Sequence, residues 1–276
     1  MSNINIIKKA QRLAAEANFK LRVDVLRLLS KAYLRETNKK AKQALSWIME
    51  NAKIAKKESL AICQDTGLPV VIIEVGRGAS ISYALIESIT KGIESGYKNN
   101  YLRPSLVEPL KRGKPSCQGI VSHIEINPKI KGLRVSLLPK GFGSENKTTL
   151  KMFNPTVTTA EIENFIVDSV EKAGPEGCPP FIVGVGIGGT SDYALLLAKR
   201  ALLERIDTPN PDIFLSNLEK RLFKKINALN IGPMGLGGRC TALAVKIKTA
   251  PTHIAGLPVG VNISCHALRS ASISIR

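Results

Sequence analysis

Three side chains that can do chemistry stand next to each other early in the sequence: Cys63, Gln64 and Asp65. A glycine and a proline follow closely, and residues 70–75 are mostly apolar, a pattern that predicts a turn leading into a buried strand. A thiolate can bind a soft metal or an iron–sulfur cluster, and a neighbouring aspartate can transfer a proton. The simpler interpretation is a buried free cysteine beside an aspartate in a turn.

Two more cysteines occupy similar positions. Cys178 precedes two prolines and the apolar run 181–185, and Cys265 closely follows the apolar run 257–263. Each is therefore predicted at a turn at one end of a strand, as is Cys63. No two cysteines form the close C-x-x-C pair of zinc ribbons, so three thiolates brought together by the fold would fit an iron–sulfur cube whose fourth iron stays open to substrate.

Two segments have the chemistry to bind an anion. Arg103 precedes Pro104, which disfavours a helix at that point, and a guanidinium at such a break suits a carboxylate. Residues 139–146 are dense in glycine and polar side chains, so their backbone N–H groups could approach an anion closely. Taken alone, Arg103 could be an ordinary surface arginine and residues 139–146 an ordinary loop.

Gly184, Gly186 and Gly189 match the G-x-G-x-x-G pattern between a predicted strand and a predicted helix. A dinucleotide site also needs an acidic residue at the end of the next strand. The acidic residues at about the right distance, Glu204 and Asp207, follow a predicted helix instead, so we do not expect nicotinamide binding. The start of that helix could still favour an anion such as a substrate carboxylate.

The charge of the chain is strongly positive, +18 from 40 basic and 22 acidic residues. The basic residues are spread along the predicted helices, and the aromatic residues, 5% of the chain, do not interleave with them. Nucleic-acid binding is therefore not expected, and most of the lysines are interpreted as a solvated basic surface.

The composition is that of a globular protein with 276 residues, 44% of them hydrophobic, enough for one large domain or two small ones. We expect neither a membrane span nor an export signal, because the apolar runs are too short. The five cysteines are scattered and odd in number, which favours free thiols in a reducing cytoplasm. Cys117 and Cys240 are interpreted as packing residues.

Hydrophobic periodicity and turn residues predict alternating helices and strands. Helices are expected within residues 3–57, then at 81–97, at 158–174 after a capping box, from about 190, and at 212–228. Strands are expected at 70–75, 123–126, 132–138, 181–185, 241–249 and, as the last strand, 257–263. The strands at 123–126 and 132–138 are predicted to pair as a hairpin across Asn127 and Pro128, and Pro251 to end the strand at 241–249.

Five motifs carry a resemblance to a known family. ICQDTG, PKGFGSEN, GCPPFIVGVGIGGT, IGPMGLGG and PTHIAGLPVGVNISCH, in this order, resemble the iron–sulfur (class I) fumarate hydratases. The similarity is greatest to the alpha subunit of the two-subunit fumarase and L-tartrate dehydratase group, and it extends from about residue 10 to 270. It implies a mixed α/β (α+β) fold like the N-terminal domain of class I fumarases, with helices packed on mixed sheets. Residues 1–276 would form one catalytic domain of two lobes, divided near residue 150.

The resemblance also implies roles for individual residues. The match assigns the ligands of a [4Fe-4S] cluster to Cys63, Cys178 and Cys265. It assigns substrate contacts to Gln64, Arg103 and Gly143, and catalytic roles to Asp65 and His253. The chain differs from the family at Phe142, where a third glycine is common, and at Ser270, where a histidine is frequent, and either difference could affect the choice of substrate.

The expected function is that of the alpha subunit of a [4Fe-4S] hydro-lyase, which interconverts fumarate plus water and (S)-malate. The alternative is an L(+)-tartrate dehydratase alpha subunit, which forms oxaloacetate from tartrate. Two other classes are a cluster-binding protein without catalysis and a nucleic-acid-binding protein. The family's catalytic threonine base has no match here, so a beta subunit is expected to supply it, in a cytoplasmic heterotetramer of two alpha and two beta subunits.

Overall fold

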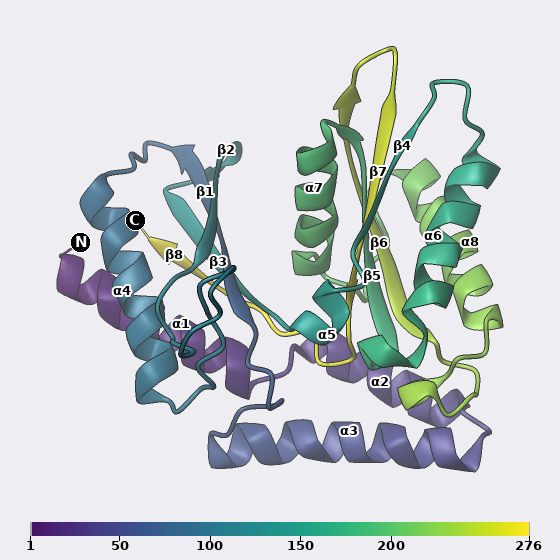
Figure 1. The fold of residues 1–276 in the computed structure, drawn as a ribbon, viewed down its shortest axis with the longest axis horizontal. Coiled ribbons are helices and arrows are strands. Elements are labelled where there is room, and N and C mark those ends of the chain that lie inside the picture. Colours follow the sequence, from purple (N-terminus) through teal and green to yellow (C-terminus); the bar gives the residue numbers. More distant parts are fainter. Residues whose placement is uncertain (1, 276) are drawn as a thin grey trace. The chain divides into compact units, whose positions relative to one another are not determined.

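A computed structural model describes residues 2–275 and divides the chain into two compact units. Unit 1 contains the described residues of Met1–Leu21, Ala52–Phe142 and Arg269–Arg276, and unit 2 contains Arg22–Asn51 and Gly143–Leu268. In each unit, helices cover a mixed four-stranded sheet (Figure 1). The predicted mixed α/β fold is therefore confirmed.

The sheet of unit 1 is built around a central strand that is apolar on both faces. Its strand order is β2-β1-β3-β8, with β1 parallel to β2 and antiparallel to β3. Val71 and Ile73 of β1 are fully buried in one cluster with Ile89 and Ile93. The bounds are β1 Leu68–Arg77, β2 Val121–Lys131, β3 Leu133–Lys140 and β8 Ala271–Ile275, with helices α1 Asn3–Phe19 and α4 Tyr83–Asn99.

The predicted helical region at residues 3–57 is confirmed as three helices. They are α1, α2 (Val23–Arg35) and α3 (Lys39–Glu58). None of the helices between residues 2 and 275 is long and apolar enough to cross a membrane.

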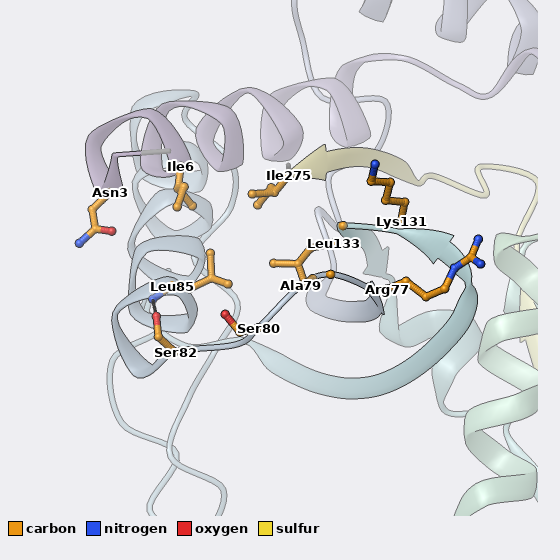
Figure 2. Close-up of a pocket in the computed structure, with 12 residues that line it drawn as sticks. Asn3, Ile6, Arg77, Ala79, Ser80, Ser82, Leu85, Lys131, Leu133 and Ile275 are labelled. Atoms are coloured by element: carbon orange, nitrogen blue, oxygen red, sulfur yellow. Dashed lines mark hydrogen bonds between the residues drawn. The ribbon is translucent and has the colours of Figure 1, made fainter.

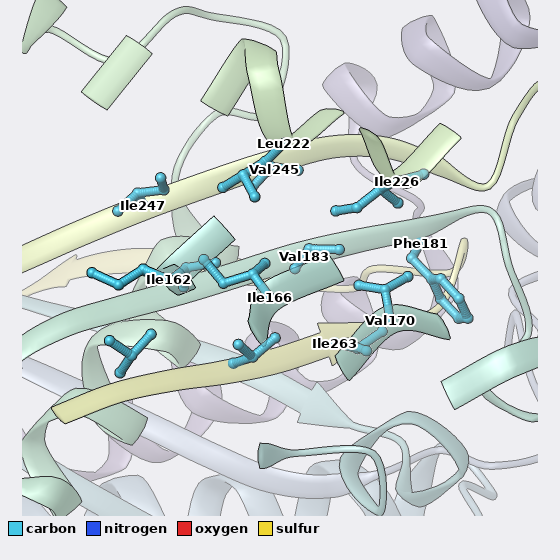
Figure 3. Packing of buried hydrophobic residues seen from close by; sticks show 14 of the residues in the cluster. Ile162, Ile166, Val170, Phe181, Val183, Leu222, Ile226, Val245, Ile247 and Ile263 are labelled. Carbon is cyan, nitrogen blue, oxygen red and sulfur yellow. The ribbon is translucent and has the colours of Figure 1, made fainter. Parts of the chain in front are cut away.

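Unit 2 has its sheet between helices on two faces (Figure 1). The strand order is β4-β7-β5-β6, and the apolar side chains of one face form a core with α6 and α8 (Figure 3). The bounds are β4 Thr149–Phe153, β5 Phe181–Gly189, β6 Ala242–Thr252, β7 Leu257–Ser264, α5 Phe142–Glu145, α6 Thr159–Ala173, α7 Ser191–Leu203 and α8 Ile213–Ala228. The capping box predicted at the start of α6 is present, between Thr158 and Glu161.

The other face of β5 explains the G-x-G-x-x-G pattern. A Cβ atom on Gly184 would lie 2.2 Å from the carbonyl oxygen of Ala198, and one on Gly186 would lie 2.0 Å from that of Ala194. Both carbonyls belong to α7, so these glycines let the helix pack directly on the strand. Their role in this fold is to allow close packing of the helix on the strand.

Three predictions of secondary structure are wrong. Strands β2 and β3 do not form a hairpin, because β1 lies between them and pairs with both. Apolar β1 takes the buried central position, β2 continues through Pro128 as an edge strand, and the chain turns at Gly132. Strand β6 likewise continues through Pro251, and β7 is not the last strand, since β8 follows it.

Candidate functional site

The turn that leads into β1 holds the carboxylate of Asp65 at both oxygens. Its Oδ1 accepts a hydrogen bond from the N–H of Gly67 at 2.9 Å, and its Oδ2 accepts one from the N–H of Phe142 at 2.8 Å. Gly67 has a left-handed φ of 76°, and a Cβ atom there would lie 2.6 Å from the backbone of Pro139. Only glycine allows this approach, which brings the end of β3 against the turn.

Two buried side chains form hydrogen bonds with the backbone of the same turn. The Tyr97 hydroxyl donates to the carbonyl of Thr66 at 2.9 Å, and the Arg269 guanidinium donates to the carbonyl of Asp65 at 2.7 Å. Burial raises the pKa of Tyr97 to about 12, so its hydroxyl keeps its proton and remains a donor at neutral pH. Two successive carbonyls of the turn are therefore fixed by hydrogen bonds.

Arg103 is tied to this turn through its backbone. The Thr66 hydroxyl donates to the carbonyl of Arg103 at 3.2 Å, while the Arg103 side chain is exposed. Unit 1 thus brings together Arg103, the half-buried Asp65 and the exposed Gln64. A cation, an amide and a carboxylate in this arrangement can bind a small dicarboxylate and transfer a proton to it.

In unit 2, Cys178 and Cys265 lie at the same end of the sheet. Cys178 precedes β5, Cys265 follows β7, and the register pairs Ile182 with Ser264. The N–H of His266 donates to the carbonyl of Cys178 at 3.3 Å, and its Nδ1 lies 3.1 Å from the same oxygen. Two of the three cysteines predicted as cluster ligands are therefore on adjoining loops.

The other two cysteines have the surroundings of protonated thiols. The sulfur of Cys117 donates to the carbonyl of Leu102 at 3.8 Å, and that of Cys240 donates to the carbonyl of Ala242 at 3.6 Å. Burial raises the pKa of Cys117, and it raises the pKa of Cys240 to about 12. A metal ligand must be a thiolate, so these two residues fit the predicted packing role.

Gly143 belongs to the short helix α5, which starts two residues after the last residue of β3. Glu145, the last residue of this helix, is fixed by its carboxylate, which accepts a hydrogen bond from Asn262 at 2.8 Å and pairs with Lys199. A Cβ atom on Gly143 would meet only the carbonyl oxygen of Glu176, at 3.8 Å. Gly143 is exposed, so its backbone is open to a ligand.

His253 does not lie with Cys178 and Cys265. It is exposed in the loop between β6 and β7, and its Nδ1 accepts from the N–H of Ala255 at 3.1 Å. Cys265 lies at the opposite end of β7, a strand of 8 residues. Such a strand spans about 25 Å, so unit 2 separates His253 from the two cysteines of the same chain.

Within residues 2–275, no three histidine, cysteine or carboxylate side chains are grouped so that they could hold a metal ion. Cys63 belongs to unit 1, whereas Cys178 and Cys265 belong to unit 2. The donor chemistry nevertheless fits an iron–sulfur cluster, because all three thiols are half-buried on turns beside strand ends.

Unit 1 also has a pocket of about 870 Å³ that is separate from the turn that carries Asp65. Ile6, Leu85, Leu133 and Ile275 converge on it (Figure 2). Arg77, the last residue of β1, also lines it, so the 10-residue strand separates this pocket from the turn that carries Asp65. Its lining is mixed, since Arg77 and Lys131 stand beside the apolar side chains, and it contains none of the predicted site residues.

Comparisons with known proteins agree with one another. The family model described as fumarate hydratase (Fumerase) matches residues 7–274. A protein of Methanocaldococcus jannaschii, provisionally named L(+)-tartrate dehydratase subunit alpha, is 42% identical over 266 residues, which cover 94% of this chain and 93% of the relative. The L(+)-tartrate dehydratase subunit alpha of Escherichia coli K12 is 26% identical over 257 residues, 92% of this chain and 84% of the relative. A Geobacillus stearothermophilus protein, provisionally named fumarate hydratase class I, is 33% identical over 280 residues; these cover 96% of this chain but 54% of the relative.

Proposed function

Because the chain belongs to the fumarate hydratase (Fumerase) family, we propose that it is the alpha subunit of an iron–sulfur hydro-lyase that interconverts fumarate plus water and (S)-malate. The observation that carries this proposal is the turn of unit 1. There the Asp65 carboxylate is held at both oxygens, and the backbone of Arg103 is hydrogen-bonded to the same turn. This geometry supports a role for Asp65 in proton transfer and a role for Arg103 in binding a substrate carboxylate.

We propose that Cys63, Cys178 and Cys265 hold a [4Fe-4S] cluster. Their half-buried positions on turns support this set, and the protonated state of the other two cysteines argues against alternatives. When bound, such a cluster supplies a Lewis acid at its open iron.

The residues of this chain would bind the substrate and move one proton. Arg103 would pair with a substrate carboxylate, while the amide of Gln64 and the backbone of Gly143 would add hydrogen bonds. This neutralisation makes the C–H next to a carboxylate more acidic, which the elimination requires. Asp65 would then give a proton to the departing hydroxyl, and in the reverse direction take one from the attacking water.

L(+)-tartrate is the second candidate substrate, because the relative with 42% identity is named as a tartrate dehydratase subunit. Malate and tartrate differ by one hydroxyl group. Phe142 lies beside this site, since its N–H donates to Asp65, and the residue is 47% exposed. Values of kcat/KM for both substrates, measured on one preparation of the complex, decide between them.

A beta subunit would supply the base and further cations. Two relatives are named as alpha subunits, and this chain spans only 54% of the fumarate hydratase class I relative. The remainder of that relative would then correspond to the partner. We propose a cytoplasmic heterotetramer with two copies of each subunit, since closed two-fold assemblies are common.

The test of this function is an assay of the chain with and without its partner. We expect the purified chain, loaded with iron and sulfide without air, to dehydrate malate and L-tartrate at the background rate. Addition of the candidate beta subunit should raise kcat into the range of about 1–10³ s⁻¹ that is usual for enzymes. Full turnover before the addition would contradict the need for a partner, and none after it would contradict the function.

The place of His253 leads to a separate prediction. Since β7 keeps it about 25 Å from Cys265 of its own chain, any contribution of His253 to that site must come from the second alpha subunit. We expect His253→Asn alone to lower turnover on the order of 10²-fold. Mixing His253→Asn with Asp65→Asn chains should restore about a quarter of the wild-type turnover, because half of the assemblies would be mixed and each would have one intact site. No recovery on mixing, or full activity of His253→Asn, would contradict this arrangement.

A further inference from the structure

Arg269 is a buried cation whose two hydrogen bonds go to neutral oxygens. Arg269 is only 3% exposed. One nitrogen donates to the carbonyl of Asp65 at 2.7 Å, and the other terminal nitrogen donates to Oδ1 of Asn18 at 3.3 Å. Its Nε has no hydrogen-bond partner among the described residues. A buried charge with such partners is costly, so its position calls for a reason other than stability.

The guanidinium of Arg269 lies close to the carboxylate of Asp65. A Cβ atom placed on Gly141 would be 3.1 Å from Oδ2 of Asp65 and 3.7 Å from Nη2 of Arg269. The two groups therefore lie within roughly 7 Å of each other, a separation at which buried charges still interact. The absence of a side chain at Gly141 leaves room for both groups.

Arg269 also completes a set of contacts that fix the backbone on both sides of Asp65. Tyr97 holds the carbonyl of Thr66, and Arg269 holds the carbonyl before it. Asn18 links α1 to the start of the turn, because its own carbonyl accepts from the N–H of Ile62 at 3.0 Å. Since Asn18 also accepts from Arg269, the arginine ties the middle of the turn to the same helix.

We propose that Arg269 is a positioning residue for the Gln64–Asp65 pair. By holding the Asp65 carbonyl, it sets the direction in which the side chains of both residues leave the turn. This inference rests on the proposed hydro-lyase function for its kinetic consequence, but its structural consequence stands separately. A residue that only filled space under the turn would not need a guanidinium.

The test compares substitutions of Arg269 with the same change at a more exposed arginine of the same unit. Arg269→Met keeps volume without charge, Arg269→Lys keeps charge with fewer donors, and Arg269→Gly leaves room for an added guanidinium ion. The control is Arg134→Met on β3, whose arginine is 3.6 Å from Glu74 and away from the turn. Two measurements are needed: kcat and KM of the assembled complex, and hydrogen exchange of residues 61–69 in the chain without iron.

We expect Arg269→Met to lower kcat about 100-fold with KM changed less than about threefold, since misplacement of a catalytic group has effects of this size. Arg269→Lys should be intermediate, and millimolar guanidinium should restore part of the turnover of Arg269→Gly but not alter the control. Hydrogen exchange should become faster only in residues 61–69. Unchanged kcat in Arg269→Met, or faster exchange throughout unit 1 with no rescue, would overturn the proposal. An inactive wild-type complex would overturn the hydro-lyase function instead. The hydrogen-exchange data would then be the only test of whether Arg269 positions the turn.

Discussion

Replacing Cys63, Cys178 or Cys265 by serine is expected to abolish iron binding, whereas the same change at Cys117 or Cys240 should leave it intact. The chain reconstituted without air should contain about four irons, and each of the first three variants should fall close to none. The reason is the protonation state of each cysteine sulfur. Cys117 and Cys240 donate S–H to backbone carbonyls and have raised pKa values, whereas a cluster ligand must be a thiolate.

The measurement is the iron content per chain together with the visible absorption of the cluster. Circular dichroism and thermal unfolding of the iron-free chains provide the control, since a variant that does not fold would also lose iron. Cys240→Ser is the most demanding comparison because that thiol is the more deeply buried of the two and its loss disturbs packing. Retention of iron in Cys265→Ser together with its loss in Cys117→Ser would disprove the assignment.

The sequence predicts the Asp65 turn well because its chemistry is contiguous. Cys63, Gln64 and Asp65 are neighbours, and Gly67 marks the turn that its left-handed φ requires. The hydrogen bond from Arg269 to the backbone of this turn could not be predicted in this way. Arg269 lies about 200 residues further along the chain, and only the fold brings it to the Asp65 carbonyl, at 2.7 Å. Its one local signal is a charge that directly follows two apolar residues.

The strands of unit 1 show what periodicity can and cannot specify. The apolar and alternating patterns predict that β1, β2 and β3 exist, and all three do. Their order depends on which strand is buried on both faces, a property of the whole sheet. Because β1 takes that place, β2 and β3 cannot pair although they are adjacent in the sequence. Strand β8 alternates over residues 271–275 but is short, and its partner β3 is distant in the sequence.

The motif that contains both His253 and Cys265 shows how contiguity can mislead. The two residues lie in one stretch that resembles the family, which suggests that they belong to one site. The intervening residues form the extended strand β7, so they separate the two ends by about 25 Å. In contrast, Cys178 is distant from Cys265 in the sequence but lies near it, because β5 and β7 pair as antiparallel neighbours.

Asp65→Asn is expected to retain iron and to lose turnover by about 10²–10⁴-fold, the usual contribution of a general acid. An amide has nearly the shape of a carboxylate but cannot supply the proton to the departing hydroxyl. The substitution has a second effect that must be separated from the first. Both oxygens of Asp65 accept backbone N–H groups, from Gly67 and Phe142, so the new NH₂ group would face one of these donors and lose a hydrogen bond.

Glu36→Gln is the matched control for this second effect. The Glu36 carboxylate is buried in unit 2, and it also accepts backbone N–H groups at both oxygens, from Thr37 and Asn38 at 2.9 and 3.0 Å and from Arg239 at 2.8 Å. Glu36→Gln should therefore lower thermal stability by an amount similar to that for Asp65→Asn while kcat stays close to the wild-type value. Both variants disturb backbone hydrogen bonds to a carboxylate, and only Asp65 is proposed to transfer a proton. Equal losses of turnover in both would mean that the Asp65 variant fails through its backbone contacts, and near-full activity of Asp65→Asn with normal iron content would rule out its role as the acid.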